Sequence, residues 1–462
     1  MKKISILLAM GILLGLLPGC NAGTQQPAVT TPQDTMPDST TPTETTPTII
    51  TPEETTPAPT TPEAPKSFHL EFGDPIVVMQ GKVGDNAWGH YQFPSLAYTL
   101  DGNIVANWSY SGDTIDDYMN DADVVRTKVS TDGGLTWSDD ASLCYTPDKF
   151  QMSNGNYFAG FKRANAHPAT WQNEYTPATT WDNDSYKMFF AEDMPKNDDT
   201  TVWGYEYNPA TDTTEEFECT INWPHAPLVE FPGGKIYPMT QMFALSQDSI
   251  ITIDGVMYLA MYFFGFNSYA EARENALNSH NRYYSCYIFS SNDNGRTWDF
   301  LSQLTTFGRS IDFSEGLCEP CLNIMPDGSV MILMRSGGNS KPSYWARSKD
   351  NCKSWSVIKK FDDIGVMPQM VTLDCGVSIA TYGRPYMRVR ATSDPTGRTW
   401  QPAQTFDMYS GKEHSSCYYT DLLPLDETHA LWIYSDFQYP NADGVPVKSI
   451  ITRVITVVFD EE

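Results

Sequence analysis

The chain of 462 residues is short of positive charge. It has 30 lysine and arginine residues against 57 aspartate and glutamate residues, which gives a formal net charge of −27. Proteins that bind nucleic acid or lie on anionic lipid depend largely on basic surface. The scarcity of lysine and arginine therefore argues against nucleic acid as a partner and against adhesion to an anionic membrane surface.

Long apolar runs are also scarce, and the one sustained run lies at the N-terminus. It extends from Ile4 to Leu17, follows Lys2 and Lys3, and leads into Pro-Gly before Cys20. A basic start, a short apolar stretch and a small final residue are typical of a secretory signal, and the run is short for a membrane span. The cysteine after the small residue resembles a bacterial lipobox. We therefore expect cleavage before Cys20 and lipid attachment there, with an ordinary signal peptide over residues 1–20 as the alternative.

Residues 21–66 lack the apolar side chains that a packed core requires. They are almost all threonine, proline, glutamate, alanine and glutamine. Such a segment cannot bury enough apolar surface to offset its ordering entropy, and its prolines keep it extended. We expect a disordered linker that holds a domain at 67–462 away from a membrane, with an O-glycosylated stalk as a further, purely compositional interpretation.

Residues 67–462 contain few long helical patterns, and the best helical candidate is 269–281. Short apolar or alternating runs dominate instead, such as 77–79, 104–106 and 330–333, and residues typical of turns bound them. This pattern predicts strands. We therefore expect an all-β domain, whose length exceeds the usual size of a single compact core unless the architecture is a closed repeat.

The cysteines do not form a recognisable metal motif. Cys318 and Cys321 have a spacing found in metal sites, but no second pair and no histidine cluster accompanies them. We expect buried free thiols or an occasional disulfide, and no metal. The cysteines other than Cys20 are Cys144, Cys219, Cys286, Cys318, Cys321, Cys352, Cys375 and Cys417.

The most informative feature that is present is a turn of the form Ser-x-Asp-x-Gly-x-Thr-Trp. It recurs with small changes at Ser130–Trp137, Ser291–Trp298, Ser348–Trp355 and Thr392–Trp400. The aspartate and the hydroxyl can accept hydrogen bonds from backbone N–H groups of the turn, and glycine allows a positive φ. The tryptophan then packs beneath the turn. A recurring hairpin of one design indicates a recurring supersecondary unit.

The spacing of these turns indicates a β-propeller. The last two intervals, from residue 291 to 348 and from 348 to 392, each suit a four-stranded blade with its loops. The interval from 130 to 291 has room for about three such units. Extended over the domain, the spacing predicts about six blades, and closure of the ring would leave no long exposed sheet edge.

These turns resemble the Asp boxes of the sialidase (neuraminidase) superfamily, whose fold is a six-bladed propeller. The resemblance covers the chain from residue 67 onward. Asp boxes lie away from the active site of that family and also occur in propellers that are not enzymes. The resemblance therefore implies the fold, and an activity depends on the individual site positions.

The first site position departs from the family pattern. Sialidases begin the domain with Phe/Tyr-Arg-Ile-Pro, whose arginine helps to hold the substrate carboxylate, whereas residues 91–94 here are Tyr-Gln-Phe-Pro. Gln92 can donate hydrogen bonds to a carboxylate but brings no charge. A cation from another loop could replace the arginine, and the candidates are Lys82, Lys162 and Arg163.

The resemblance places the general acid on the loop that leads to the first Asp box. Distance along the chain from Gln92 favours Asp117, and the alternatives on this loop are Asp113, Asp116, Asp121 and Asp123. A catalytic acid needs a pKa raised by burial or by neighbouring carboxylates, and this crowding supplies such neighbours. The loop could equally be a solvated acidic segment.

Two further stretches resemble the family's substrate-binding and catalytic strands. Glu319, and Arg335 at the end of an apolar run, match the catalytic glutamate and the second arginine, with a structural ion pair as the alternative. Arg384 fits the third arginine best, while Arg388 and Arg390 also lie within reach of the pattern.

The family's nucleophile is a tyrosine, and Cys417-Tyr418-Tyr419-Thr420 resembles the segment that carries it. The register favours Tyr419, with Tyr418 as the alternative and core packing as the role that needs no catalysis. A phenol, with a pKa of about 10, is a poor nucleophile unless a base takes its proton. The resemblance gives that role to Glu319.

The resemblance thus implies an exo-glycosidase that releases terminal sialic acid or a related acidic sugar from glycans with retention and without a cofactor, and the segment before residue 67 predicts that it is anchored at the cell surface. A tyrosine nucleophile suits an anomeric carbon that bears its own carboxylate. The expected partner is a glycan substrate, and we expect membrane contact only through the lipid anchor. A glycosidase of different specificity and a non-catalytic glycan-binding propeller remain the alternatives.

Overall fold

The computed structural model describes residues 67–460, apart from 121–124, 141, 145–149, 172–173, 182–184, 247–248, 265–283, 306–315, 338–340 and 408–415. The expected signal segment, Cys20, the linker and the helical candidate at 269–281 lie outside the described residues. So do Asp121 and Asp123.

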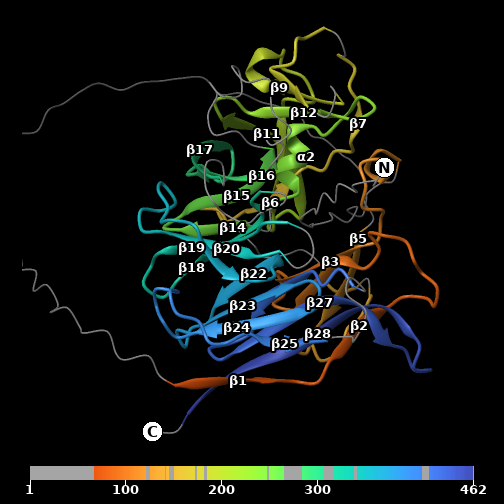
Figure 1. The fold of residues 1–462 in the computed structure, drawn as a ribbon, viewed down its shortest axis with the longest axis vertical. Coiled ribbons are helices and arrows are strands. Elements are labelled where there is room, and N and C mark those ends of the chain that lie inside the picture. The colour runs from red at the N-terminus through yellow and green to blue at the C-terminus, as the bar shows by residue number, and fades with distance from the viewer. Residues whose placement is uncertain are drawn as a thin grey trace, which may run out of the picture. The chain divides into compact units, whose positions relative to one another are not determined.

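The described residues form an all-β fold, which confirms the predicted class (Figure 1). The helices in this part of the chain are two short α-helices, α1 (Asp117–Asn120) and α2 (Met239–Ala244), and one 3-10 turn, Ala191–Asp193. None of the described helices is long and apolar enough to cross a membrane. The strands form six sheets.

Three of the sheets are antiparallel and follow the chain order strand by strand. The first contains β3 (Gln92–Tyr98), β4 (Ile104–Ser109) and β5 (Val125–Ser130). The second contains β18 (Cys318–Ile324), β19 (Val330–Arg335), β20 (Ser343–Ser348) and β21 (Lys359–Asp362). The third contains β22 (Val366–Thr372), β23 (Ser378–Gly383), β24 (Met387–Thr392) and β25 (Gln404–Phe406). Each of these sheets is therefore a meander of consecutive antiparallel strands, as a propeller blade requires.

A larger sheet joins two antiparallel groups through one parallel contact, between β11 and β17. One group is β14 (Ile250–Ile253), β15 (Val256–Phe264), β16 (Tyr284–Ser291) and β17 (Thr297–Leu304). The other is β6 (Tyr157–Phe161), β10 (Val202–Asn208) and β11 (Thr213–Asn222). Strands of a fifth sheet lie in the chain between β6 and β14, and they are β7 (His167–Pro168), β8 (Thr179–Trp181), β9 (Tyr186–Phe190), β12 (Pro227–Phe231) and β13 (Lys235–Ile236).

The sixth sheet brings the two ends of the described chain together. It contains β26 (Thr420–Pro424), β27 (His429–Pro440) and β28 (Pro446–Phe459). The early strands β1 (Phe68–Phe72) and β2 (Ile76–Gln80) both pair with β28, and β1 lies along it at the bottom of Figure 1. The number of blades stays a prediction, because one sheet merges two groups and the strands of another come from the chain between β6 and β14.

The repeated turns have the hydrogen bonds that their sequence predicts. In the turn at 291–298, Gly295 N–H donates to Ser291 Oγ at 2.9 Å and Thr297 N–H donates to Asp293 Oδ1 at 2.8 Å. The turns at 130–137 and 348–355 repeat both bonds. In the latter, Cys352 takes the place of glycine with a φ of 64°.

The turns lie at the strand ends opposite to Gln92 and Arg335. In the first sheet Ser130 pairs with Ile104, whereas Gln92 pairs with Ser109 at the other end of β4. In the second sheet Ser348 pairs with Val330, and Arg335 lies at the far end of the same strand. The strands therefore separate the turns from the ends that carry the candidate site residues.

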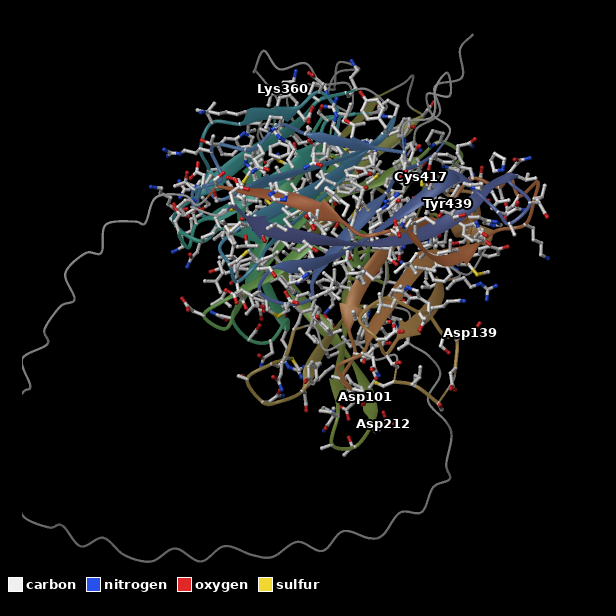
Figure 2. All side chains as sticks on the ribbon, turned by 90° about the horizontal axis from the view of Figure 1, so that it is seen from below. Asp101, Asp139, Asp212, Lys360, Cys417 and Tyr439 are labelled. Carbon is white, nitrogen blue, oxygen red and sulfur yellow. The ribbon has the colours of Figure 1, made fainter. Side chains whose placement is uncertain are left out.

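Acidic side chains also occupy exposed loops. Asp101, Asp139 and Asp212 are exposed, and Figure 2 places all three at the periphery of the fold. Cys417, in contrast, is fully buried among the strands. The negative net charge is thus carried in part by loops that do not contribute to the core.

The turn carboxylates predict a loss of stability in acid. Hydrogen bonds from the hydroxyl and N–H of Ser354 lower the pKa of Asp350 from 3.8 to about 2. Because the folded state lowers this pKa, the stabilisation is complete above about pH 4 and disappears as the pH falls toward 2. Asp350→Asn should therefore flatten the decline of the melting temperature between pH 5 and 2. Asp74→Asn, at an exposed carboxylate, is the control, and equal slopes for wild type and Asp350→Asn would contradict the prediction.

Candidate active site

The candidate residues lie at strand ends from four sheets. Gln92 begins β3, Glu319 is the second residue of β18, and Arg335 ends β19. Arg384 directly follows β23, and Tyr419 directly precedes β26. Side chains placed on rigid strand ends of different sheets can converge on one point.

Glu319 and Arg335 form a buried ion pair. Arg335 Nη1 donates to Glu319 Oε1 at 2.6 Å, and each side chain is only 1% exposed. Arg335 Nε donates to Gly337 O at 2.6 Å, and Met367 N–H donates to Glu319 Oε2 at 2.7 Å. Both carboxylate oxygens and two guanidinium nitrogens therefore have fixed partners.

A bulge in β18 gives Glu319 its position. The register with β19 shifts between Cys318 and Cys321, and Glu319 has a φ of 43°. A bulge leaves an extra residue unpaired and redirects its side chain. The left-handed backbone is unfavourable for glutamate, and such outliers concentrate at functional sites.

Arg384 has one nitrogen without a partner. Its Nε donates to Cys417 O at 3.1 Å, and its Cζ lies 5.3 Å from the centre of the Tyr419 ring and 5.9 Å from that of Trp88. Nη2 is buried and has no hydrogen-bond partner among the described residues. An unsatisfied buried donor is costly, and a negatively charged or polar ligand would satisfy it.

Tyr419 is fully buried, and its ring stacks on Phe93 at 4.3 Å between centroids. Its hydroxyl has no hydrogen-bond partner among the described residues. Burial raises the pKa of this phenol far above 10. The charged side chains that also act on its pKa are Arg384 and Arg335, which lower it, and Glu319 and Asp113, which raise it.

Gln92 is buried and faces a carboxylate. In the amide orientation that satisfies its neighbours, its NH₂ group donates to Asp113 Oδ2 at 3.3 Å and its carbonyl accepts from Gly89 N–H at 3.0 Å. Trp88 Nε1 also donates to Asp113 Oδ2, at 2.9 Å. Of the cations that could replace an arginine here, Lys162 is paired with Glu216 at 2.8 Å.

The acidic loop presents Asp113 and Asp117 differently. Asp113 is buried between Gln92 and Trp88. Asp117 is half-buried at the start of α1, and its Oδ2 accepts from Thr114 Oγ1 at 2.6 Å. Asp113 is one of the charged groups that raise the pKa of the Tyr419 phenol. The favoured residue from the sequence, Asp117, stays a prediction.

The alternatives for arginine and tyrosine have other partners. Arg388 is paired with Asp362, and Arg390 Nε donates to Gln401 O at 2.9 Å. Tyr418 is buried, and its hydroxyl donates to Asp407 O at 2.8 Å. Arg388, Arg390 and Tyr418 are therefore held by structural contacts. Arg384 and Tyr419 remain the better candidates for the site.

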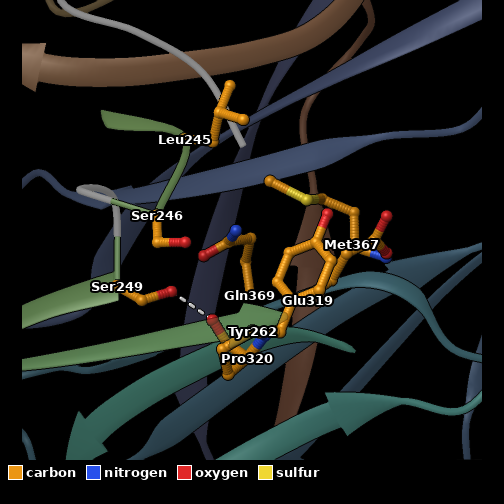
Figure 3. A pocket seen from close by; sticks show the side chains of 8 residues that line it. All are labelled: Leu245, Ser246, Ser249, Tyr262, Glu319, Pro320, Met367 and Gln369. Atoms are coloured by element: carbon orange, nitrogen blue, oxygen red, sulfur yellow. Dashed lines mark hydrogen bonds between the residues drawn. The ribbon is translucent and has the colours of Figure 1, made fainter. Parts of the chain in front are cut away.

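A pocket opens beside Glu319 (Figure 3). It is lined by Leu245, Ser246, Ser249, Tyr262, Glu319, Pro320, Met367 and Gln369. Ser249 Oγ donates to Pro320 O, and the Tyr262 side chain points toward Met367 and Glu319. Burial, with Glu319 as the next contribution, raises the pKa of Tyr262 well above 10. Five of the eight lining residues have polar side chains, and the three apolar ones are Leu245, Pro320 and Met367.

Tyr262 escaped the sequence analysis, although the repeated turns contain a signal for it. Met257 pairs with Ser291, the first residue of a turn, and Tyr262 lies five positions later on β15. Val330 pairs with Ser348, the first residue of the next turn, and Arg335 lies five positions later on β19. Counting from the turns would thus have placed Tyr262 where the neighbouring unit has Arg335.

No metal centre is apparent in the described part of the chain. No group of three or more histidine, cysteine, aspartate or glutamate side chains there could hold a metal ion. The described cysteines, including Cys318 and Cys321, form no disulfide with one another, and most are buried. Of the two expectations for the cysteines, buried thiols or an occasional disulfide, the described residues show no disulfide.

Comparisons with known proteins give structural neighbours only. No protein-family model matches, and no curated protein matches. A protein of unknown function from Dyadobacter fermentans is 15% identical, over 84% of this chain and 99% of its own, with a TM-score of 0.51. An α-L-arabinofuranosidase from Fusarium graminearum (12% identity, 83% and 97% coverage, TM-score 0.43) and an intramolecular trans-sialidase from Ruminococcus gnavus (13%, 82% and 96%, 0.40) are more distant. The chain therefore shares its fold with the Dyadobacter protein over most of both chains.

Proposed function

We propose that the chain is a retaining exo-glycosidase with a sialidase-like active site. The observation that carries this proposal is the buried hydroxyl of Tyr419, which has no hydrogen-bond partner among the described residues. The charged groups that shift its pKa come from several sheets and are Arg384, Arg335, Glu319 and Asp113. A polar group buried at such cost, among charges from several sheets, is typical of a reactive group.

Tyr419 would act as the nucleophile. Its oxygen attacks the anomeric carbon, its proton passes to Glu319, and the bond to the leaving oxygen breaks. The phenol requires a base because burial raises its pKa. Glu319 can serve because a carboxylate has about four acceptor sites and its two hydrogen bonds occupy only two. Water then cleaves the glycosyl-tyrosine and restores the phenol.

We assign protonation of the leaving oxygen to Asp113. Its support is that Asp113 is buried, acts on the Tyr419 phenol and is positioned by Trp88 and Gln92. Asp117 keeps the position that the sialidase resemblance favours, but it is directed to Thr114. The same aspartate would deprotonate the water in the second step.

The proposed substrate is a glycan with a terminal sialic acid or related acidic sugar. Arg384 supplies an Nη2 that has no hydrogen-bond partner among the described residues and can bind a carboxylate, and Arg335 adds positive charge that Glu319 largely neutralises. Gln92 adds none and faces Asp113, which favours a neutral glycone as the second candidate. The test is a panel of fluorogenic exo-glycosides, acidic and neutral, with the full chain. Binding without any turnover would indicate a glycan-binding propeller instead.

Restoring a cation at position 92 should strengthen activity on acidic sugars. Gln92→Arg places a guanidinium beside Asp113 and the substrate carboxylate, and a charge-assisted hydrogen bond contributes about 1.5–3 kcal/mol. We expect kcat/KM for an acidic glycoside to rise roughly 10- to 100-fold. Gln92→Met, which is similar in size and neutral, is the matched control. An equal rise in both variants, or none in Gln92→Arg, would contradict this role of position 92.

We also propose that the fold is a six-bladed propeller. The units would be β3–β5, β6 with β10 and β11, β14–β17, β18–β21, β22–β25, and β26–β28 with β1. The sheet of β7, β8, β9, β12 and β13 would be an insertion in the second unit. Its support is the antiparallel order within each unit and the closure of the last sheet by β1.

Attachment to the cell surface is a further part of the proposal. Its support is the sequence alone, in which an apolar segment ends at Cys20 and a threonine- and proline-rich linker separates it from the domain. Lipid on Cys20 would hold the enzyme next to glycans outside the cell. Mass spectrometry of the mature N-terminus would detect the modified cysteine.

A further inference from the structure

Trp88 is a large aromatic residue left partly open to solvent beside the candidate site. Its exposure is 39%, whereas Trp108, Trp298 and Trp432 are almost fully buried. Single apolar residues on a surface are common and need no explanation. Trp88 differs because its Nε1 donates to Asp113, the proposed acid, and because its ring centre lies 5.9 Å from Cζ of Arg384, which we assign to substrate binding.

The chain fixes the orientation of this indole. Gly89, the next residue, has a φ of 100°, and a Cβ there would lie 2.1 Å from Ser111 O, so only glycine allows this close approach. Gly89 N–H is also held by the Gln92 carbonyl at 3.0 Å. On the other side of Trp88, Ala87 N–H donates to Asp85 Oδ1 at 3.2 Å.

A second set of contacts holds residues 85–90 in place. Lys448 Nζ donates to Ala87 O and lies 3.8 Å from Asp85 Oδ1. His90 Nδ1 lies 3.3 Å from Asp85 Oδ2, and the His90 ring stacks on Tyr110 at 4.2 Å. The indole is thus exposed and pre-positioned, which is the combination that reduces the entropic cost of binding a ligand.

The neighbours of Trp88 indicate which part of a substrate it would meet. The residue that protonates the leaving oxygen must lie on the leaving-group side of the scissile bond, and Trp88 is hydrogen-bonded to Asp113, to which we assign that step. A pyranose ring has an apolar face of C–H groups, which packs favourably on the flat face of an indole.

We propose that Trp88 forms the binding platform for the leaving sugar, so that the enzyme recognises a glycoside whose leaving group is itself a sugar ring. This inference rests on the proposed function and adds a subsite to it. Arg384 lies next to one part of the indole ring. The part of the ring that is exposed to solvent packs against the leaving sugar, whose glycosidic oxygen Asp113 protonates.

The test compares two substrates that share the glycone cleaved in the panel, a methyl glycoside and a disaccharide. Both are assayed with the full chain as wild type, Trp88→Ala and Trp88→Phe. Trp88→Ala should raise KM for the disaccharide about tenfold and change KM for the methyl glycoside less than about twofold. Trp88→Phe keeps an aromatic face but loses the N–H bond to Asp113, so its KM for the disaccharide should stay within about threefold of wild type.

The controls separate stacking from support of Asp113. Leu135→Ala removes another exposed apolar side chain, in the repeated turn at 130–137, and should change neither KM. An equal rise of the disaccharide KM in Trp88→Ala and Trp88→Phe would overturn the platform, because the weaker binding would then come from the lost indole N–H bond to Asp113. An unchanged disaccharide KM in Trp88→Ala would overturn it as well.

Failure of the proposed function would give a different result. If wild type cleaves no glycoside of the panel, the proposed catalytic function is refuted. Sugar binding to Trp88 is then tested without turnover. Saturation-transfer NMR with a sialyl-galactose disaccharide, which carries the proposed acidic glycone, then compares wild type and Trp88→Ala. A sugar signal that disappears in Trp88→Ala supports the platform, and a signal that persists overturns it.

Discussion

Replacing Tyr419 with phenylalanine is expected to abolish glycoside turnover without destabilising the protein. Loss of a nucleophile should reduce kcat at least about 1000-fold. The hydroxyl is buried and has no partner among the described residues, so its removal relieves an unsatisfied polar group. The free energy of unfolding should therefore stay the same or rise by about 1 kcal/mol. The ring remains stacked on Phe93, because phenylalanine has the same shape.

The neighbouring tyrosine provides a matched control. The Tyr418 hydroxyl donates to Asp407 O at 2.8 Å, so Tyr418→Phe should lower the free energy of unfolding by about 1 kcal/mol and leave turnover intact. Turnover is measured on the glycoside that wild type cleaves, and stability by urea denaturation. A Tyr419→Phe variant that retains activity, or that loses stability as Tyr418→Phe does, would show that the phenol is structural.

The fold class could be predicted because strands leave a local pattern. The apolar runs at 77–79, 104–106 and 330–333 lie in β2, β4 and β19. The turn sequences also predicted their own hydrogen bonds, since serine, aspartate and glycine act within a few residues of one another. The sheet of β7, β8, β9, β12 and β13 was not predicted, because several of its strands are only two or three residues long and because β12 pairs with β9, and β13 with β7, across long stretches of chain.

Part of the candidate site could be located by counting residues along the strands from the repeated turns. Glu319 and Arg335 are joined in the structure, and Arg384 lies against Tyr419, as their relation to strand ends and turns suggested. Strand pairing is regular, so counting along the chain carries from one end of a strand to the other.

The choice between Asp113 and Asp117 could not be made in this way. The two residues share one loop, and the direction of each side chain depends on contacts with Trp88, Gln92 and Thr114. The bulge that directs Glu319 is equally invisible in the sequence, because a register shift depends on the partner strand. Tertiary contacts of this kind decide the direction of each of these side chains.

Breaking the ion pair between Glu319 and Arg335 should be the most destabilising change at the site. Both side chains are only 1% exposed, and the contact is 2.6 Å. Removing one partner leaves an uncompensated buried charge, which costs about 3–5 kcal/mol. That is a large part of the 5–15 kcal/mol that stabilises most domains. Glu319→Ala and Arg335→Ala should therefore both unfold at much lower urea concentration than wild type.

Replacing both partners tests whether charge burial is the cause. Glu319→Leu combined with Arg335→Met fills similar space without charge and should recover most of the stability that either single change loses. The exposed pair Lys360–Asp363, with side chains 53% and 75% exposed, is the control, and Asp363→Ala should change stability by less than about 1 kcal/mol. Figure 2 places Lys360 well away from Cys417 beside the site.

The double replacement also separates stability from catalysis. A protein that recovers its fold but no turnover would agree with Glu319 as the base for Tyr419, because the proton acceptor is then missing from an intact site. Recovered turnover would exclude Glu319 from that role and reduce the pair to a structural contact. If the double variant were as unstable as Glu319→Ala, the buried charge would not be the cause of the lost stability. The cause would then be the packing around the β18 bulge.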